Sequence, residues 1–114
     1  MPHFVVEYSR GIADDAGLGQ VMDQLVAAGV ESGCMQLADI KVRATPYDHY
    51  RLAQPGQTFI HVTVSLLEGR SDAVKAGLAV IVRDKLDALL SEVTSISIDI
   101  RDMNPVAYKK RLLA

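Results

Sequence analysis

The first two residues of the chain offer a reactive amine. Met1 is followed by Pro2, and so small a second residue permits removal of the initiator methionine, which leaves a secondary amine. An α-amino group titrates near ~7.7–8.0, and a nearby cation or an apolar pocket lowers that pKa. The neutral amine is a general base for proton transfer. A retained Met1 would make the Pro2 nitrogen an inert amide, and a proline here without function is the alternative interpretation.

The histidines, one early carboxylate and the single cysteine carry weaker signals. His61 lies on the polar side of an expected strand, where a hydrogen-bonded structural histidine is commoner than a catalytic one. His3 and His49 are too isolated in sequence to indicate a metal site with His61. Cys34 follows a glycine-rich helix end without a paired base, so we expect an inert thiol. For Glu7 we favour a structural role.

The composition excludes several classes of protein. The 114 residues are 49% hydrophobic and 23% charged, which is typical of one folded domain spanning residues 1–114. A single cysteine rules out an internal disulfide and a cysteine-rich zinc site. A net charge of −2 and the absence of tryptophan argue against nucleic-acid binding. No apolar run approaches the ~18 residues that span a membrane, and Glu7 interrupts any signal peptide, so we expect a cytoplasmic protein.

The hydrophobic periodicity predicts four strands and two long helices. The expected strands are residues 3–9, 37–45, 58–67 and 95–101, and the expected helices are residues 14–30 and 72–93. Gly29 and Gly33 are predicted to end the first helix, and Pro46 to interrupt the second strand.

Turn and cap signals complete the pattern. Residues 54–57 (Gln-Pro-Gly-Gln) predict a turn, and Ser71 is a candidate N-cap for the second helix. Residues 108–113 suggest a short basic terminal helix.

The order strand-helix-strand occurs twice, which predicts an α+β fold. Each helix joins two strands through a right-handed parallel crossover, so two β-α-β units form a four-stranded mixed sheet with both helices on one face. The other face, which bears His61, Thr63 and Ser65, is left uncovered in a single chain. An exposed sheet face of that size needs a partner or a function.

Four short segments, in this order and spacing, resemble one family. The duplicated plan, with Pro2 leading into the first strand, resembles the tautomerase superfamily and, within it, the 5-carboxymethyl-2-hydroxymuconate isomerase family. The likeness runs over nearly the whole chain. The segments that carry it are PHFVVE at residues 2–7, DIKVR at 39–43, FIHVTV at 59–64 and GRS at 69–71.

The resemblance implies a cofactor-independent isomerase of small carboxylate substrates. Members are trimers whose sheets face inward, so a homotrimer would cover the open sheet face. The reaction shifts a double bond in a carboxylated dienol or keto acid during aromatic compound catabolism, without metal or organic cofactor. By this resemblance Pro2 would take a proton from the dienol and return it at a carbon of the conjugated system.

The resemblance also assigns substrate-binding cations. Arg70 matches the family's substrate-binding arginine, and its guanidinium suits a bidentate grip on a carboxylate at a helix N-terminus. Lys41 stands where close relatives carry arginine, and a lysine cannot make the same two-pronged contact. Arg43 faces the same way as Lys41 and is a second candidate. A solvated loop arginine is the alternative for Arg70, and a surface or interface charge for Arg43.

Two other functions stay open at the level of sequence. The first is a non-catalytic trimeric binding protein that keeps the fold without the chemistry, which the lysine at position 41 would suit. The second is a ferredoxin-like α+β module that dimerises through its sheet.

Overall fold

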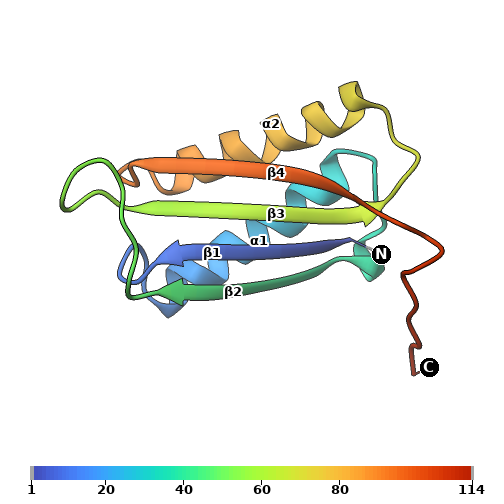
Figure 1. Cartoon of the computed structure of the whole chain (residues 1–114), viewed down its shortest axis with the longest axis horizontal. Helices are drawn as coiled ribbons and strands as arrows, with labels where there is room; N and C mark the ends of the chain where they lie inside the picture. The colour runs from blue at the N-terminus through green and yellow to red at the C-terminus, as the bar shows by residue number, and fades with distance from the viewer. Residues whose placement is uncertain (1, 114) are drawn as a thin grey trace.

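The alternating strand residues and the two helical stripes form a four-stranded sheet backed by two helices (Figure 1). The computed structural model describes residues 2–113. Its elements are β1 (His3–Ser9), α1 (Asp15–Glu31), a 3-10 turn η1 (Leu37–Asp39), β2 (Lys41–Tyr47), β3 (Phe59–Leu67), α2 (Asp72–Leu89) and β4 (Ser95–Met103).

The strand order is β2-β1-β3-β4, and the sheet is mixed. β1 runs parallel to β2, and β3 runs parallel to β4, each pair being joined through a helix. The two halves meet where β1 pairs antiparallel with β3. The predicted α+β fold, with duplicated β-α-β units and both helices on one face, is confirmed.

The helix-covered face of the sheet holds the hydrophobic core. Along β3 every second residue is buried, and Ile60, Val62 and Val64 are fully inaccessible to solvent. Leu25 of α1 and Leu86 of α2 pack against this face and are equally buried. Each such side chain contributes about 1.5–3 kcal/mol on burial, so the helices are held firmly to this side. Within residues 2–113, neither helix has the length and apolarity needed to cross a membrane.

The sequence predicted that Gly29 ends the first helix, and this prediction was wrong. α1 continues to Glu31, and Gly29 is buried inside it, where a side chain would meet Met35 and Ile40. The glycine is therefore needed for close packing between the helix and the following loop. The second predicted terminator is confirmed, since Gly33 has a φ of +73°, a backbone conformation that favours glycine.

The second strand begins later than expected and passes through Pro46. Residues 37–39 form the 3-10 turn, so the strand starts only at Lys41. Pro46 is tolerated inside β2 because this strand lies at the edge of the sheet, where a missing backbone N–H costs no ladder bond. The prediction that Pro46 interrupts the strand was wrong.

The second helix and the tail also differ from expectation. α2 ends at Leu89 rather than at residue 93, because Leu90 leaves the helical conformation and its side chain turns into the core. No helix forms over residues 108–113. That segment carries three consecutive positive charges, and so short a helix without a packed apolar face is only marginally stable.

Gly29 provides a test of the packing between α1 and η1. A Cβ atom at this position would lie 2.6 Å from Met35 Sδ and 3.0 Å from Ile40 Cδ1. We expect Gly29→Ala to lower the free energy of unfolding by about 1 kcal/mol, because overpacking outweighs the better helix propensity of alanine. Gly19→Ala is the matched control in the same helix, where a Cβ meets nothing within 4 Å, and it should raise stability. Urea denaturation measures both, and equal stability of the two variants would contradict the packing argument.

Candidate active site

Pro2 lies immediately before β1, the strand that pairs with β2 on one side and with β3 on the other. Its ring is fully buried, and its carbonyl oxygen accepts a hydrogen bond of 3.1 Å from the backbone N–H of Lys41. The pairing of His3 with Ser65 places Pro2, one residue earlier, beside the end of β3. Because β1 is an inner strand, the adjacent His3 pairs with both β2 and β3, and this holds Pro2 at the strand end. Met1 lies outside the described residues.

Two predicted cations of β2 lie beside this strand end. Lys41 pairs with His3 in the sheet register and Arg43 with Val5, so both project from the open face, as the alternation predicts. The Lys41 ammonium donates a 3.1 Å hydrogen bond to the carbonyl oxygen of Asp39. The exposed Arg43 donates through Nη1 to His3 Nδ1 at 3.2 Å.

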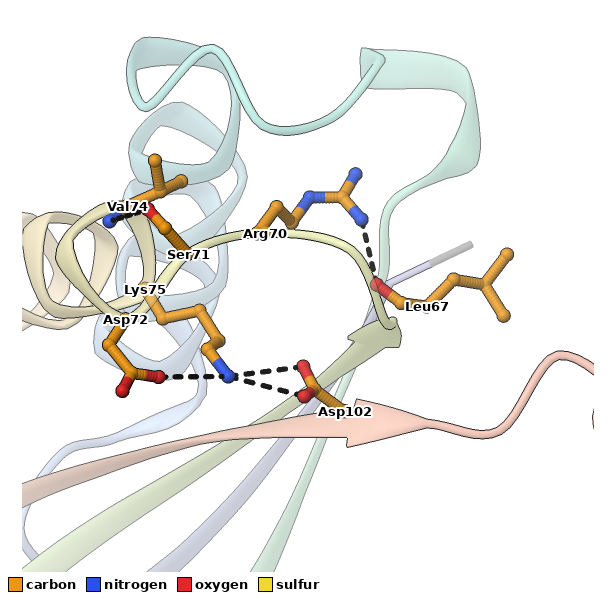
Figure 2. Close-up of polar contacts among 7 residues, drawn as sticks. All are labelled: Leu67, Arg70, Ser71, Asp72, Val74, Lys75 and Asp102. Atoms are coloured by element: carbon orange, nitrogen blue, oxygen red, sulfur yellow. Dashed lines mark hydrogen bonds and ion pairs between the residues drawn. The ribbon is translucent and has the colours of Figure 1, made fainter.

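Arg70 lies in the loop between β3 and α2, at the same end of the sheet (Figure 2). Its Nη1 donates to the carbonyl oxygen of Leu67 at 2.8 Å, and its Nη2 donates to that of Cys34 at 2.6 Å. The half-buried guanidinium thus ties the end of β3 to the loop after α1. These two contacts use two of its five N–H donors, which leaves enough for a bidentate contact with a carboxylate.

The start of α2 holds this loop in place. Ser71 accepts a hydrogen bond of 3.2 Å from the backbone N–H of Val74, which confirms the predicted N-cap. Lys75 lies between Asp102 of β4, at 3.2 Å, and Asp72 at 3.5 Å (Figure 2). The hydrogen bond to Asp102 raises the pKa of Lys75, so the ammonium stays charged and anchors the helix to the sheet.

The partners of the three predicted cations are all neutral in the described part of the chain. Lys41 and Arg70 contact backbone carbonyls, and Arg43 contacts an imidazole. Other cations pair with carboxylates: Arg10 with Asp48, Lys75 with Asp102, Lys85 with Glu31, Arg83 with Asp84 and Arg101 with Asp99. Neutral acceptors orient a cation without cancelling its charge. Lys41, Arg43 and Arg70 therefore keep their own positive charges near Pro2.

The pKa of His3 is affected by these nearby charges. Its pKa is lowered, first by burial and then by the positive charges of Arg43 and Lys41. Both causes disfavour the protonated form of a base. An amine on the neighbouring residue would experience the same charges.

The remaining polar candidates do not converge on Pro2. His61 Nδ1 lies 2.7 Å from Ser97 Oγ on the open face, which fits the structural role expected for it. Glu7 accepts a hydrogen bond from the Tyr47 hydroxyl, which raises the pKa of that tyrosine. Among residues 2–113, no group of three metal-ligating side chains is arranged to hold an ion.

A wide hollow of about 450 Å³ lies in the loop at residues 48–57. This loop follows β2 and precedes β3, so it sits at the end of the sheet opposite Pro2 (Figure 1). A strand of seven residues is about 23 Å long at the usual rise. The hollow is therefore separate from the cluster of cations.

Sequence reasoning missed two contributors to the site. The backbone carbonyl of Cys34 holds Arg70, although the thiol itself only approaches the carbonyl of Ser32 at 3.8 Å. The Tyr108 hydroxyl lies 2.9 Å from His3 Nε2, with the two rings edge to face. Neither contact has a sequence signal, because both join residues far apart in the chain.

Comparison with known proteins identifies relatives of the whole chain. The family model described as 5-carboxymethyl-2-hydroxymuconate isomerase matches residues 2–112. A 5-carboxymethyl-2-hydroxymuconate Delta-isomerase from Escherichia coli is 29% identical over 118 residues, covering 97% of this chain and 94% of the relative.

Solved structures share the fold at lower identity. A 5-carboxymethyl-2-hydroxymuconate isomerase from Deinococcus radiodurans R1 superposes with a TM-score of 0.75 at 20% identity, over 96% of this chain and 88% of that one. A fused 4-OT symmetric trimer gives 0.83 at 21% identity, over 95% and 90%. The protein Pt0534, inactivated by 2-oxo-3-pentynoate, gives 0.84 at 17% identity, again over 95% and 90%.

The pKa of His3 tests the effect of the nearby positive charges. Removing the Arg43 charge by Arg43→Gln should raise the pKa of His3, because the second-largest cause of its depression is lost. Histidine ring signals followed by NMR through a pH titration measure the change. Arg83→Gln, on α2 and paired with Asp84, removes an equal charge far from the site and should leave the His3 titration where it is. An unchanged His3 pKa in Arg43→Gln would contradict the assignment.

Proposed function

Since the chain belongs to the 5-carboxymethyl-2-hydroxymuconate isomerase family, it is an isomerase of the tautomerase superfamily, and we propose that the amine of Pro2 carries the proton in its reaction. The amine, freed by loss of Met1, takes a proton from the dienol substrate and returns it at another carbon of the conjugated system. One double bond shifts, and no atom is gained or lost. The buried ring and the inner-strand position support this role by holding the nitrogen still.

The observation that carries this proposal is that three cations at the Pro2 end of the sheet, Lys41, Arg43 and Arg70, contact only neutral partners among residues 2–113. A base must be neutral to accept a proton, and nearby cations keep an amine neutral by lowering its pKa. Burial and then the charges of Arg43 and Lys41 lower the pKa of the adjacent His3. The same charges would act on the Pro2 amine and lower its pKa, which favours the neutral form that a general base needs.

The cations also bind the substrate in this mechanism. Arg70 grips a carboxylate through its remaining N–H donors, and Arg43 offers a second guanidinium from the open face. Lys41 is a compact charge, which suits the oxygen that becomes negative as the proton leaves the dienol. These roles suit a small carboxylate from aromatic compound breakdown, and we place the enzyme in the cytoplasm.

We further propose that three chains assemble through their open sheet faces. The side chains of this face are half-buried in the single chain, with Val5 and Thr63 at its centre. Four structural neighbours are fused 4-OT trimers, two of them symmetric and two asymmetric. A trimer would cover the open face and place the Pro2 end of the sheet near a subunit interface.

Replacing Pro2 tests the proton carrier. With Met1 removed from both proteins, Pro2→Ala should reduce kcat/KM for ketonisation of phenylenolpyruvate by about 10²-fold or more, the contribution typical of a positioned general base. Intact mass confirms the loss of methionine before each assay. Wild-type activity in processed Pro2→Ala would contradict the proposal that the Pro2 amine carries the proton.

An alkynone supplies an activity-independent test of the same amine. 2-Oxo-3-pentynoate, which inactivates one structural neighbour, should add to the neutral Pro2 amine. The nitrogen bonds the alkyne carbon that lies β to the ketone, and the proton moves to the α carbon, so the mass rises by one reagent. A chain with an extra leucine between Met1 and Pro2 is the control, because its Pro2 nitrogen is an amide. Equal labelling of both chains would rule out a nucleophilic Pro2.

Assembly is tested by native mass. The wild type should have the mass of three 12.4 kDa chains. Thr63→Arg places a charge at the centre of the open face and should dissociate the trimer. Ala76→Arg adds the same charge to the exposed side of α2 and should not. A dimer in the wild type would instead favour the ferredoxin-like module that dimerises through its sheet, and a monomer would contradict assembly through the open face.

A further inference from the structure

The C-terminal tail folds back on the candidate site through one side chain. After β4, the carbonyl oxygen of Asn104 accepts hydrogen bonds from the backbone N–H groups of Ala107 and Tyr108, at 3.1 and 2.9 Å, which turns the chain. The tail then runs past the end of the sheet where β1 begins (Figure 1). Val106 is 78% exposed, whereas the ring of Tyr108 is half-buried against His3.

The hydrogen bonds around His3 define its tautomer. A guanidinium can only donate, so the contact between Arg43 Nη1 and His3 Nδ1 makes Nδ1 the acceptor. In neutral imidazole the proton must then sit on Nε2, which donates to the Tyr108 oxygen at 2.9 Å. The three side chains therefore form one directed chain from Arg43 through His3 to Tyr108.

We propose that Tyr108 is a positioning residue for carboxylate binding, because it holds His3 in the tautomer whose Nδ1 accepts from Arg43. This inference rests on the proposed function, in which Arg43 binds substrate. Arg43 is exposed and long, so an unrestrained guanidinium would lose rotamer freedom each time it binds an anion. Because Tyr108 and His3 already restrict Arg43 in the free protein, less side-chain entropy is lost when Arg43 binds the anion.

His3 is neutral, so it can orient Arg43 without cancelling the positive charge of the guanidinium. A carboxylate in its place would hold Arg43 more strongly but would cancel the charge that attracts the substrate. The charged side chains that act on His3 are positive in the described part of the chain: Arg43 and Lys41 of β2 and Lys110 of the tail. Burial, followed by these charges, lowers the pKa of His3, so the imidazole stays neutral down to a lower pH than an ordinary histidine does. Below that lowered pKa both ring nitrogens donate, and Arg43 is released.

Tyr108→Phe isolates the hydroxyl while keeping the aromatic ring. In the processed enzyme it should raise KM for phenylenolpyruvate about tenfold, as expected for the loss of one orienting hydrogen bond to a binding group, with kcat changed less than about twofold. Nitrogen NMR of the neutral His3 ring should show the Nε2–H tautomer in the wild type and a mixture in the variant. Tyr50→Phe, at the opposite end of the sheet, is the matched control and should change neither quantity.

A double variant separates positioning from a general effect on structure. If Tyr108 acts through Arg43, Tyr108→Phe should add nothing to the KM of Arg43→Gln. Multiplicative effects of the two substitutions, an unchanged KM in Tyr108→Phe, or an unchanged His3 tautomer would each overturn the inference. The proposed function fails on a different result, namely wild-type activity in processed Pro2→Ala.

Discussion

The structure depends on the burial of one face of the sheet. Every second residue of β1 and β3 must face α1 and α2, because those side chains supply the core. This constraint sets the register of both strands, since a shift by one residue would turn the apolar side chains outward. It also decides that His3, Lys41 and Arg43 project from the opposite face and that the ring of Pro2 is buried at the strand end.

The same arrangement holds three cations, Lys41, Arg43 and Arg70, without a carboxylate partner among residues 2–113. Backbone carbonyls at strand and helix ends are strong acceptors that carry no net charge. Lys41 and Arg70 use such carbonyls, and Arg43 uses a neutral imidazole. In the proposed reaction these charges favour a neutral Pro2 amine and an anionic substrate, while a hydrogen bond holds each of the three cations in place.

Local signals in the chain account for most of the fold. Strand alternation, the Ser71 cap and Gly33 act through neighbouring residues, so their positions could be predicted. Long-range contacts decided the remainder. Gly29 stays helical because Met35 and Ile40 pack on it, and Pro46 stays in a strand because that strand lies at an edge.

The sequence by itself determined the α+β plan, the family and the residue types that proton transfer requires. The tertiary structure alone decided how those residues are held. Arg70 is tied to Cys34, 36 residues away, and His3 to Tyr108, 105 residues away. Neither contact leaves a periodic pattern in the chain, because a hydrogen bond between distant residues depends on how strands and loops meet in space. The neutral partners that preserve the charge of the site therefore became visible only in the folded protein.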